Sequence, residues 1–121
     1  MKIDHFYIKV DNLDEAIDFY EKLLGMEIAH REGDRWADFQ KEDEVYFGIF
    51  NAAHDNEIPV CGNNITLSLK SENINEDYKR VKRLYPKSIT NIIIIKQPSM
   101  YRYFQFEDPW QNVWEVAEYS C

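Results

Sequence analysis

Hydrophobic and polar residues change their spacing near the start of the chain. From Ile3 to Val10 they alternate, which indicates a strand. Beyond Asn12 the apolar residues recur every three or four positions, which indicates an amphipathic helix. Asn12 is suited to cap that helix together with Glu15, as in a capping box, and Gly25 is suited to end it. The apolar face of the predicted helix consists of Leu13, Ala16, Ile17, Tyr20, Leu23 and Leu24.

Three short strands are predicted after this helix, at about 27–31, 35–40 and 44–50, with turns at 33–34 and 41–43 between them. Residues 52–62 are polar, contain Pro59 and Gly62, and lack periodicity. They are interpreted as a linker.

The same pattern then begins again. Residues 64–69 alternate as a strand, and Asn73 lies 61 positions after Asn12, with Glu76 at the same offset from Glu15. Pro86 is expected to end the second helix, and strands are predicted at about 91–96, 101–107 and 113–119. The same shift carries the first helix face onto Ile74, Tyr78, Val81, Leu84 and Tyr85, and fails only where Ala16 falls on Asp77.

This repeat predicts an α+β fold of two tandem βαβββ modules, at 1–51 and 63–121. A chain of 121 residues fits a single domain by its length. One helix can cover only one face of a small sheet, so the remaining faces are expected to meet or to curve into a cup that holds a ligand, with the helices outside.

Composition restricts the possible partners. The formal net charge of −8 argues against nucleic acid and against an anionic membrane surface, and it is compatible with a cationic ligand. Aromatic residues make up 15% of the chain, which suits a pocket for flat or apolar molecules. No signal peptide or membrane span is expected, so we predict a cytoplasmic protein. Cys61 and Cys121 are then expected to stay reduced, although a disulfide between them is an open alternative.

Three stretches together resemble the vicinal oxygen chelate superfamily, which includes glyoxalase I, bleomycin-resistance proteins and extradiol dioxygenases. They are His5, 11-DNLDEAIDFYEKLLG-25 and 106-FEDPWQNVWEVAEY-119. The resemblance implies paired βαβββ modules that form a cup, in homodimers whose subunits share the binding groove. In metal-dependent members, the first and fourth strands of each module supply the ligands of a divalent ion.

His5 and Glu115 match two of the metal-ligand positions that the resemblance implies. The other two positions fall on Phe47 and on Thr66 (or Asn64 after a two-residue slip), which are not usual ligands for zinc or iron. His30 and His54 lie elsewhere and do not complete the set. We therefore expect no cofactor, with a divalent metal held partly by His5 and Glu115 as the alternative.

His5 itself has three interpretations. It can be a metal ligand, a structural histidine, or a polar residue of the cup that is hydrogen-bonded to Glu115 or to a ligand. In the last case His5 and Glu115 form a candidate acid/base pair, because a carboxylate beside an imidazole in a semi-apolar cup perturbs both pKa values.

Strand alternation predicts which side chains fill the core and which line the cup. The core set consists of Phe6, Ile8, Leu67, Leu69, Trp114 and Val116. The opposite faces carry the candidate ligand-binding residues His5, Tyr7, Trp36, Phe47, Thr66, Ser68, Tyr101, Tyr103 and Glu115, with Ile49, Val113 and Ala117 between them.

Three functions remain open from the sequence. The first is a small-molecule binding protein of the bleomycin-resistance type, with an apolar or cationic ligand in an aromatic-lined cup. The second is a metal-dependent lyase or dioxygenase resembling glyoxalase I. The third is an interaction module that offers an exposed aromatic residue such as Trp110 to a partner, although Trp110 can equally pack locally.

Overall fold

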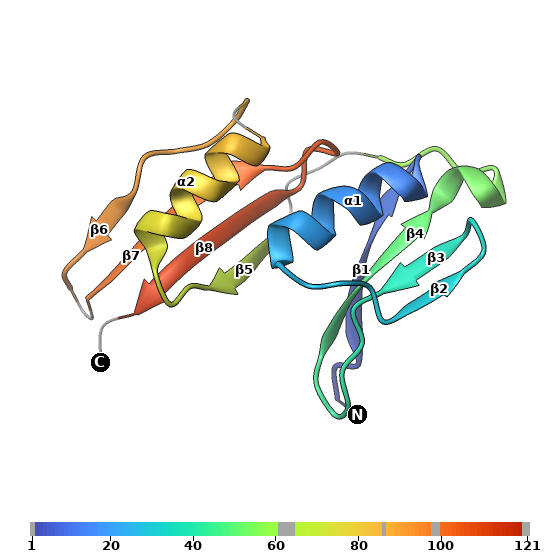
Figure 1. Cartoon of the computed structure of the whole chain (residues 1–121), viewed down its shortest axis with the longest axis horizontal. Coiled ribbons are helices and arrows are strands. Elements are labelled where there is room, and N and C mark those ends of the chain that lie inside the picture. Colours follow the sequence, from blue (N-terminus) through green and yellow to red (C-terminus); the bar gives the residue numbers. More distant parts are fainter. Residues whose placement is uncertain (1, 61–64, 86, 98–99, 120–121) are drawn as a thin grey trace. The chain divides into compact units, whose positions relative to one another are not determined.

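A computed structural model describes residues 2–60, 65–85, 87–97 and 100–119 (Figure 1). The chain divides into two compact units, one within residues 1–60 and the other within residues 61–121. Each unit contains one of the predicted modules. Among the described residues, no helix is long and apolar enough to cross a membrane.

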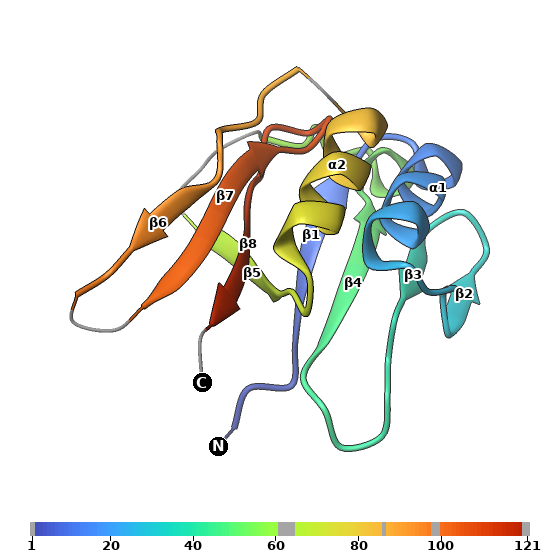
Figure 2. The same cartoon turned by 60° about the vertical axis from the view of Figure 1, so that its left-hand side comes forward.

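The first unit is a four-stranded sheet with one long helix. In chain order its elements are β1 (His5–Val10), α1 (Leu13–Leu24), β2 (His30–Glu32), β3 (Trp36–Asp38), β4 (Tyr46–Asn51) and the 3-10 helix η1 (Ala52–Asp55). The strands lie in the order β1-β4-β3-β2, with β1 parallel to β4 and the other pairs antiparallel (Figure 2).

The second unit repeats this topology. Its elements are β5 (Thr66–Lys70), α2 (Ile74–Leu84), β6 (Ile93–Ile95), β7 (Tyr101–Glu107) and β8 (Val113–Tyr119). The strand order is β5-β8-β7-β6, again with one parallel pair at the crossover. The predicted α+β fold of two βαβββ modules is therefore confirmed. The predicted linker differs in part, because its first residues form η1 and Ala52 is buried.

The two helices start in the same way, as the repeat predicts. The Asn12 side chain accepts a hydrogen bond from the backbone N–H of Glu15 at 3.0 Å. The Asn73 side chain accepts one from Glu76 at 3.2 Å. Each bond satisfies a backbone donor that the first turn of a helix otherwise leaves unpaired. Gly25 ends α1 with a φ of 66°, a left-handed conformation that glycine adopts without a steric penalty.

Each helix packs against one face of its own sheet. α1 lies on β3 and β4, and α2 lies on β7 and β8. Tyr20 of α1 and Ile74 of α2 are fully buried in these interfaces. Other large side chains that are almost fully buried are Leu13, Leu23, Ile49, Val81, Phe104 and Phe106.

The predicted faces of β4 are wrong by one residue. Phe47 lies 5.1 Å from the Tyr20 ring of α1, measured between centroids, and 6.1 Å from Phe39. It is paired with Phe6 of β1, and Ile49 is paired with Ile8. Phe47 and Ile49 therefore face the helix, and Tyr46, Gly48 and Phe50 lie beside His5, Tyr7 and Lys9. Phe6, expected in the core, is 45% exposed.

The turn after β7 is organised by a buried carboxylate. Asp108 accepts hydrogen bonds from the backbone N–H groups of Trp110 and Asn112, both at 2.9 Å. It also accepts bonds from the Asn112 side chain and from the indole N–H of Trp114. Trp110 is only 7% exposed, so the idea that it is offered to a partner is wrong.

Some sequence predictions lie outside the described residues. These are the state of Cys61 and Cys121, the alternative ligand position Asn64, and the termination of the second helix at Pro86. The organisation as a single domain also stays a prediction, because the chain divides into two compact units.

Replacing Asp108 with alanine should destabilise the protein by about 2–3 kcal/mol, because several buried donors lose their acceptor at once. Chemical denaturation followed by circular dichroism measures this. Glu72→Ala, at an exposed carboxylate, is the control and should change stability by less than about 0.5 kcal/mol. Equal losses for the two variants would contradict the role assigned to Asp108.

Candidate functional site

Aromatic side chains gather on the face of the first sheet that α1 does not cover. We define this aromatic face as His5, Tyr7, Trp36 and Tyr46. The His5 ring stacks on Tyr46 with centroids 4.7 Å apart and planes 12° from parallel. Trp36 meets His5 edge-on at 5.8 Å and Tyr7 at 5.5 Å. The four rings therefore form one contiguous surface, on which Tyr7 remains 51% exposed.

Two features fix the position of the Trp36 ring. One is the space left by Gly48, and the other is a hydrogen bond to Asp38. Gly48 has no side chain, and a Cβ added there would overlap the Trp36 ring. The indole N–H donates to Asp38 at 2.8 Å. Because the ring needs the empty position at Gly48 and the acceptor at Asp38, its orientation is fixed from both ends.

Asp38 is a buried carboxylate whose oxygens are all engaged. Besides Trp36 it accepts the backbone N–H of Gln40 at 3.1 Å and is bonded to the His30 ring at 3.0 Å. Burial alone would raise the pKa of Asp38, but the hydrogen bonds from Trp36, His30 and Gln40 outweigh it and hold this pKa below its ordinary value. Asp38 is therefore ionised at neutral pH.

His5 has a carboxylate partner within its own unit. Its Nδ1 lies 2.6 Å from the Asp4 carboxylate, and its side chain is 28% exposed. A carboxylate on one ring nitrogen fixes the orientation of an imidazole and leaves Nε2 for another contact. The arrangement is suited to ligand binding, proton transfer or metal ligation.

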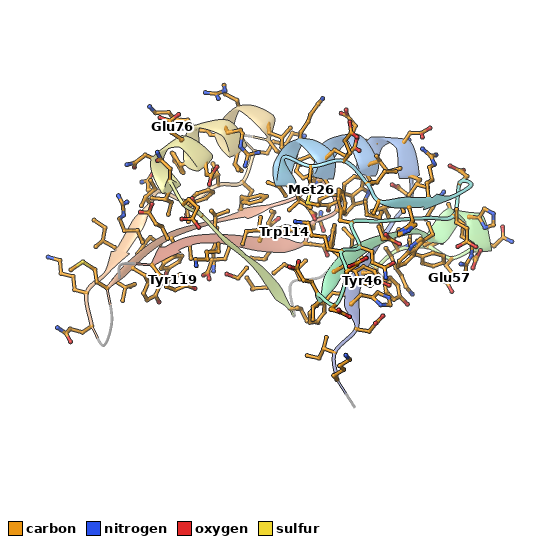
Figure 3. The ribbon with its side chains drawn as sticks, turned by 60° about the horizontal axis from the view of Figure 1, so that its bottom comes forward. Met26, Tyr46, Glu57, Glu76, Trp114 and Tyr119 are labelled. Carbon is orange, nitrogen blue, oxygen red and sulfur yellow. The ribbon has the colours of Figure 1, made fainter. Side chains whose placement is uncertain are left out.

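Tyr46 occupies the strand position that the sequence prediction gave to Phe47. Burial raises the pKa of its phenol, and the negative charges of Asp4 and Asp38 raise it further. The phenol therefore stays protonated in the neutral range. It is a hydrogen-bonding group rather than an anionic metal ligand, although it lies against His5. Figure 3 labels Tyr46 among the side chains of this unit.

The second unit places Glu115 on the sheet face that α2 leaves uncovered. Ser68 donates to Glu115 at 3.3 Å, and the Gln105 amide donates to its other oxygen at 3.3 Å. Thr66 and Ser68 lie on this face and are exposed, as predicted. The face also carries ring contacts among Tyr101, Tyr103 and Tyr119.

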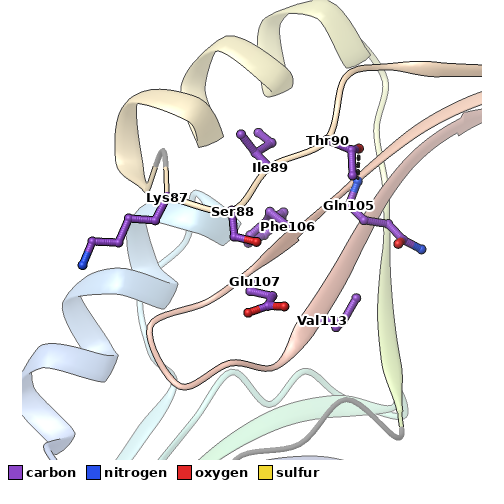
Figure 4. Close-up of a pocket in the computed structure, with 8 residues that line it drawn as sticks. All are labelled: Lys87, Ser88, Ile89, Thr90, Gln105, Phe106, Glu107 and Val113. Carbon is purple, nitrogen blue, oxygen red and sulfur yellow. Dashed lines mark hydrogen bonds between the residues drawn. The ribbon is translucent and has the colours of Figure 1, made fainter.

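A shallow pocket of about 310 Å³ lies beside this face in the second unit (Figure 4). Its lining includes Gln105 and Glu107 of β7 and Val113 of β8. The Thr90 hydroxyl accepts the backbone N–H of Gln105 at 3.0 Å at its rim. Gln105 thus links this pocket to Glu115.

His5 and Glu115 lie in different units, so their pairing stays a prediction. Within each unit the other predicted residues fall on the uncovered faces, except Phe47. Across the part of the chain that the structure describes, no three His, Cys, Asp or Glu side chains gather as they would around a metal ion. His54 lies in η1, where Asp55 is 2.8 Å from its Nδ1.

Comparison with known families agrees with this topology. A model of the Glyoxalase/Bleomycin resistance protein/Dioxygenase superfamily matches residues 2–116. The chain belongs to this superfamily. An uncharacterized Bacillus subtilis (strain 168) protein, YwbC, is 29% identical to the chain over 115 residues, covering 89% of this chain and 90% of YwbC.

Solved structures of the superfamily share its fold. The lactoylglutathione lyase of Agrobacterium tumefaciens matches with a TM-score of 0.68 at 20% identity, over 97% of this chain and 92% of the lyase. A glyoxalase-related enzyme from Fulvimarina pelagi matches with a TM-score of 0.69 at 15% identity, over 98% and 88% of the two chains. At such identities the likeness shows the glyoxalase-type fold alone.

Sequence reasoning missed four residues that shape the aromatic face. Asp4 was absent from the prediction because its role depends on a local turn toward His5. Tyr46 was absent because the predicted faces of β4 turned Phe47 toward the cup, whereas the structure pairs Tyr46 with His5. Asp38 and Gly48 carried a detectable signal, since an acidic residue and a glycine inside short apolar strands are unusual and indicate a buried partner or a close approach.

Because the pKa of Asp38 is lowered in the folded protein, the free energy of unfolding should depend on pH in the acid range. A carboxyl with a depressed folded-state pKa contributes fully above its unfolded value, about 3.9, and loses this contribution as the pH falls through the folded value. At pH 6 we expect Asp38→Asn to be less stable than the wild type by about 1–3 kcal/mol, because an amide nitrogen cannot accept the indole hydrogen bond.

Urea denaturation of both proteins between pH 6 and pH 3 measures this difference, which should shrink toward pH 3. Glu42→Gln, at an exposed carboxylate, is the control and should show no such trend. A gap between Asp38→Asn and the wild type that is constant with pH would contradict the assignment.

Proposed function

We propose that the protein binds a flat small molecule, apolar or cationic, on the aromatic face of the first unit. The supporting observation is that four aromatic rings form one surface on the sheet face that α1 does not cover. Rings ordinarily pack into a core, so an exposed, mutually ordered group suits a ligand that stacks on it.

The charges around the aromatic face favour a cation over an anion. Asp4 is bonded to His5 at the edge of the face, and its side chain is 78% exposed. Asp38 is an ionised carboxylate that accepts the indole N–H of Trp36. Aromatic faces also attract cations through the ring quadrupole. The formal net charge of −8 adds a long-range attraction for the same class of ligand.

The proposal includes the Glu115 face as a second set of ligand contacts, from Thr66, Ser68, Tyr101, Tyr103 and Glu115. The ordered bonds from Ser68 and Gln105 support it, because they hold a carboxylate in one orientation. We further propose that the protein is a homodimer in the cytoplasm, and this part of the proposal is supported by the sequence alone. Light scattering of the purified protein tests whether it is a dimer.

Proflavine, a flat tricyclic cation, should bind the wild-type protein more tightly than anthracene-9-carboxylate, a tricyclic anion of similar size. Tyr7→Ala should weaken proflavine binding about tenfold, since it removes an exposed ring worth ~1–2 kcal/mol to a stacked cation. Fluorescence titration measures both affinities.

The matched control is Ile58→Ala, which removes an apolar side chain that is 88% exposed and lies outside the aromatic face. It should leave proflavine affinity unchanged. Tighter binding of the anion, or equal proflavine affinity in Tyr7→Ala and the wild type, would rule out this choice of ligand class and surface.

A second candidate function, a metal-dependent lyase or dioxygenase, is favoured by one observation. Asp4 engages Nδ1 of His5, which is how a carboxylate commonly orients a histidine that ligates a metal through Nε2. Glu115 would supply a further ligand, as the superfamily pattern implies. Phe47 cannot take part because it faces α1.

Metal analysis of protein purified without chelators distinguishes the two functions. If the protein is a binding protein, the wild type and His5→Ala should both contain well under one equivalent of zinc, nickel, manganese or iron per chain. A stoichiometric metal in the wild type that is lost in His5→Ala would instead establish the enzyme. His54→Ala is the control, since that histidine lies in η1.

A further inference from the structure

His30 extends the aromatic face toward the edge of the first sheet. The strand register aligns His30 of β2 with Asp38 of β3, Asp38 with Gly48 of β4, and Gly48 with Tyr7 of β1. Residues paired in this way share one face of a sheet. His30 therefore lies on the same face as Trp36, whose ring covers the gap at Gly48.

The protonation pattern around Asp38 follows from its hydrogen bonds. A buried ionised carboxylate can only accept, so each group bonded to it must donate. The Trp36 indole and the Gln40 amide are donors by their chemistry. The third group, Nδ1 of His30 at 3.0 Å, must then carry its proton.

A neutral histidine with its proton on Nδ1 has a lone pair on Nε2. Among the described residues, the only hydrogen-bond partner of the His30 ring is Asp38, and the His30 side chain is 63% exposed. Asp38 is itself nearly fully buried and is bonded to Nδ1 of the imidazole. Nε2 is therefore an oriented acceptor on the open side of the sheet.

We propose that His30 is a ligand-binding residue whose Nε2 accepts a hydrogen bond from an N–H or O–H group of the molecule bound on the aromatic face. This inference rests on the proposed function and adds a requirement to it. The ligand carries a donor group at the edge of its flat ring system.

The dimensions of the sheet fit such a ligand. His30 lies two strands from Gly48, which corresponds to about 10 Å at the usual strand spacing. A tricyclic ring system is about that long, so a molecule stacked beside Trp36 and Tyr7 reaches His30 with a substituent at one end. Asp38 contributes to both contacts, because it fixes Trp36 through one oxygen and His30 through the other.

Two dyes separate the hydrogen bond from the stacking. Both dyes are tricyclic cations with a protonated ring nitrogen in the middle, but proflavine carries amino N–H groups at its ends, whereas acridine orange carries dimethylamino groups there that cannot donate. His30→Phe retains an aromatic ring but removes the acceptor. We expect His30→Phe to lower proflavine affinity roughly three- to tenfold and to leave acridine orange affinity within about twofold of the wild type.

The matched control is His54→Phe, because His54 also has Nδ1 on an aspartate but belongs to η1. It should change neither affinity. If both dyes bind the wild type and His30→Phe leaves proflavine affinity unchanged, the role of His30 is wrong while the proposed function stands. If neither dye binds the wild type, the proposed function fails and this inference fails with it.

The tautomer can be read without any ligand. Nitrogen-15 NMR of the histidine side chains distinguishes a protonated Nδ1 from a protonated Nε2. In the neutral form of the ring, the His30 signals should show a proton on Nδ1 and a free Nε2, and this preference should be lost in Asp38→Asn. A proton on Nε2 in the neutral ring of the wild type would overturn the inference.

Discussion

One physical constraint shapes this protein: each four-stranded sheet has a single helix to cover it. α1 and α2 bury the apolar sides of β4 and of β7 and β8. The opposite side of each sheet is not covered by the α-helix of its own unit. A sheet face of ordered aromatic rings that the helix of its unit leaves uncovered is costly to retain unless something binds it, because apolar surface in water opposes folding.

On the first sheet, the bare face depends on Asp38. This buried carboxylate accepts the indole N–H of Trp36 through one oxygen and the ring N–H of His30 through the other. Gly48 leaves the space into which the Trp36 ring fits. Trp36 then supports His5 and Tyr7, and His5 stacks on Tyr46. One buried charge thus orders both a stacking surface and a hydrogen-bond acceptor beside it, which is the kind of preorganisation that favours binding.

The sequence predicted the fold better than the site, and particular residues show why. The caps at Asn12 and Asn73 and the 61-residue repeat depend on local chemistry, and both were confirmed. The face of Phe47 depended on which residues of β4 and β1 are paired. The structure pairs Phe47 with Phe6, so Phe47 shares the face of Phe6 and not that of His5 and Tyr7, and a difference of one residue in this register reverses every side chain of the strand. The contacts of Asp38 join β2, β3 and the start of the next loop, so they depend on tertiary pairing that no local pattern encodes.

The most direct test of the central claim is to locate a flat cation on the protein by NMR. Titration of isotope-labelled protein with proflavine should shift the indole N–H signal of Trp36 and the ring signals of His5, Tyr7 and Tyr46 together, with one dissociation constant. The Trp114 indole, bonded to Asp108 in the second unit, should not move. Shifts confined to residues outside the aromatic face, or no saturable shift of Trp36, would contradict the account.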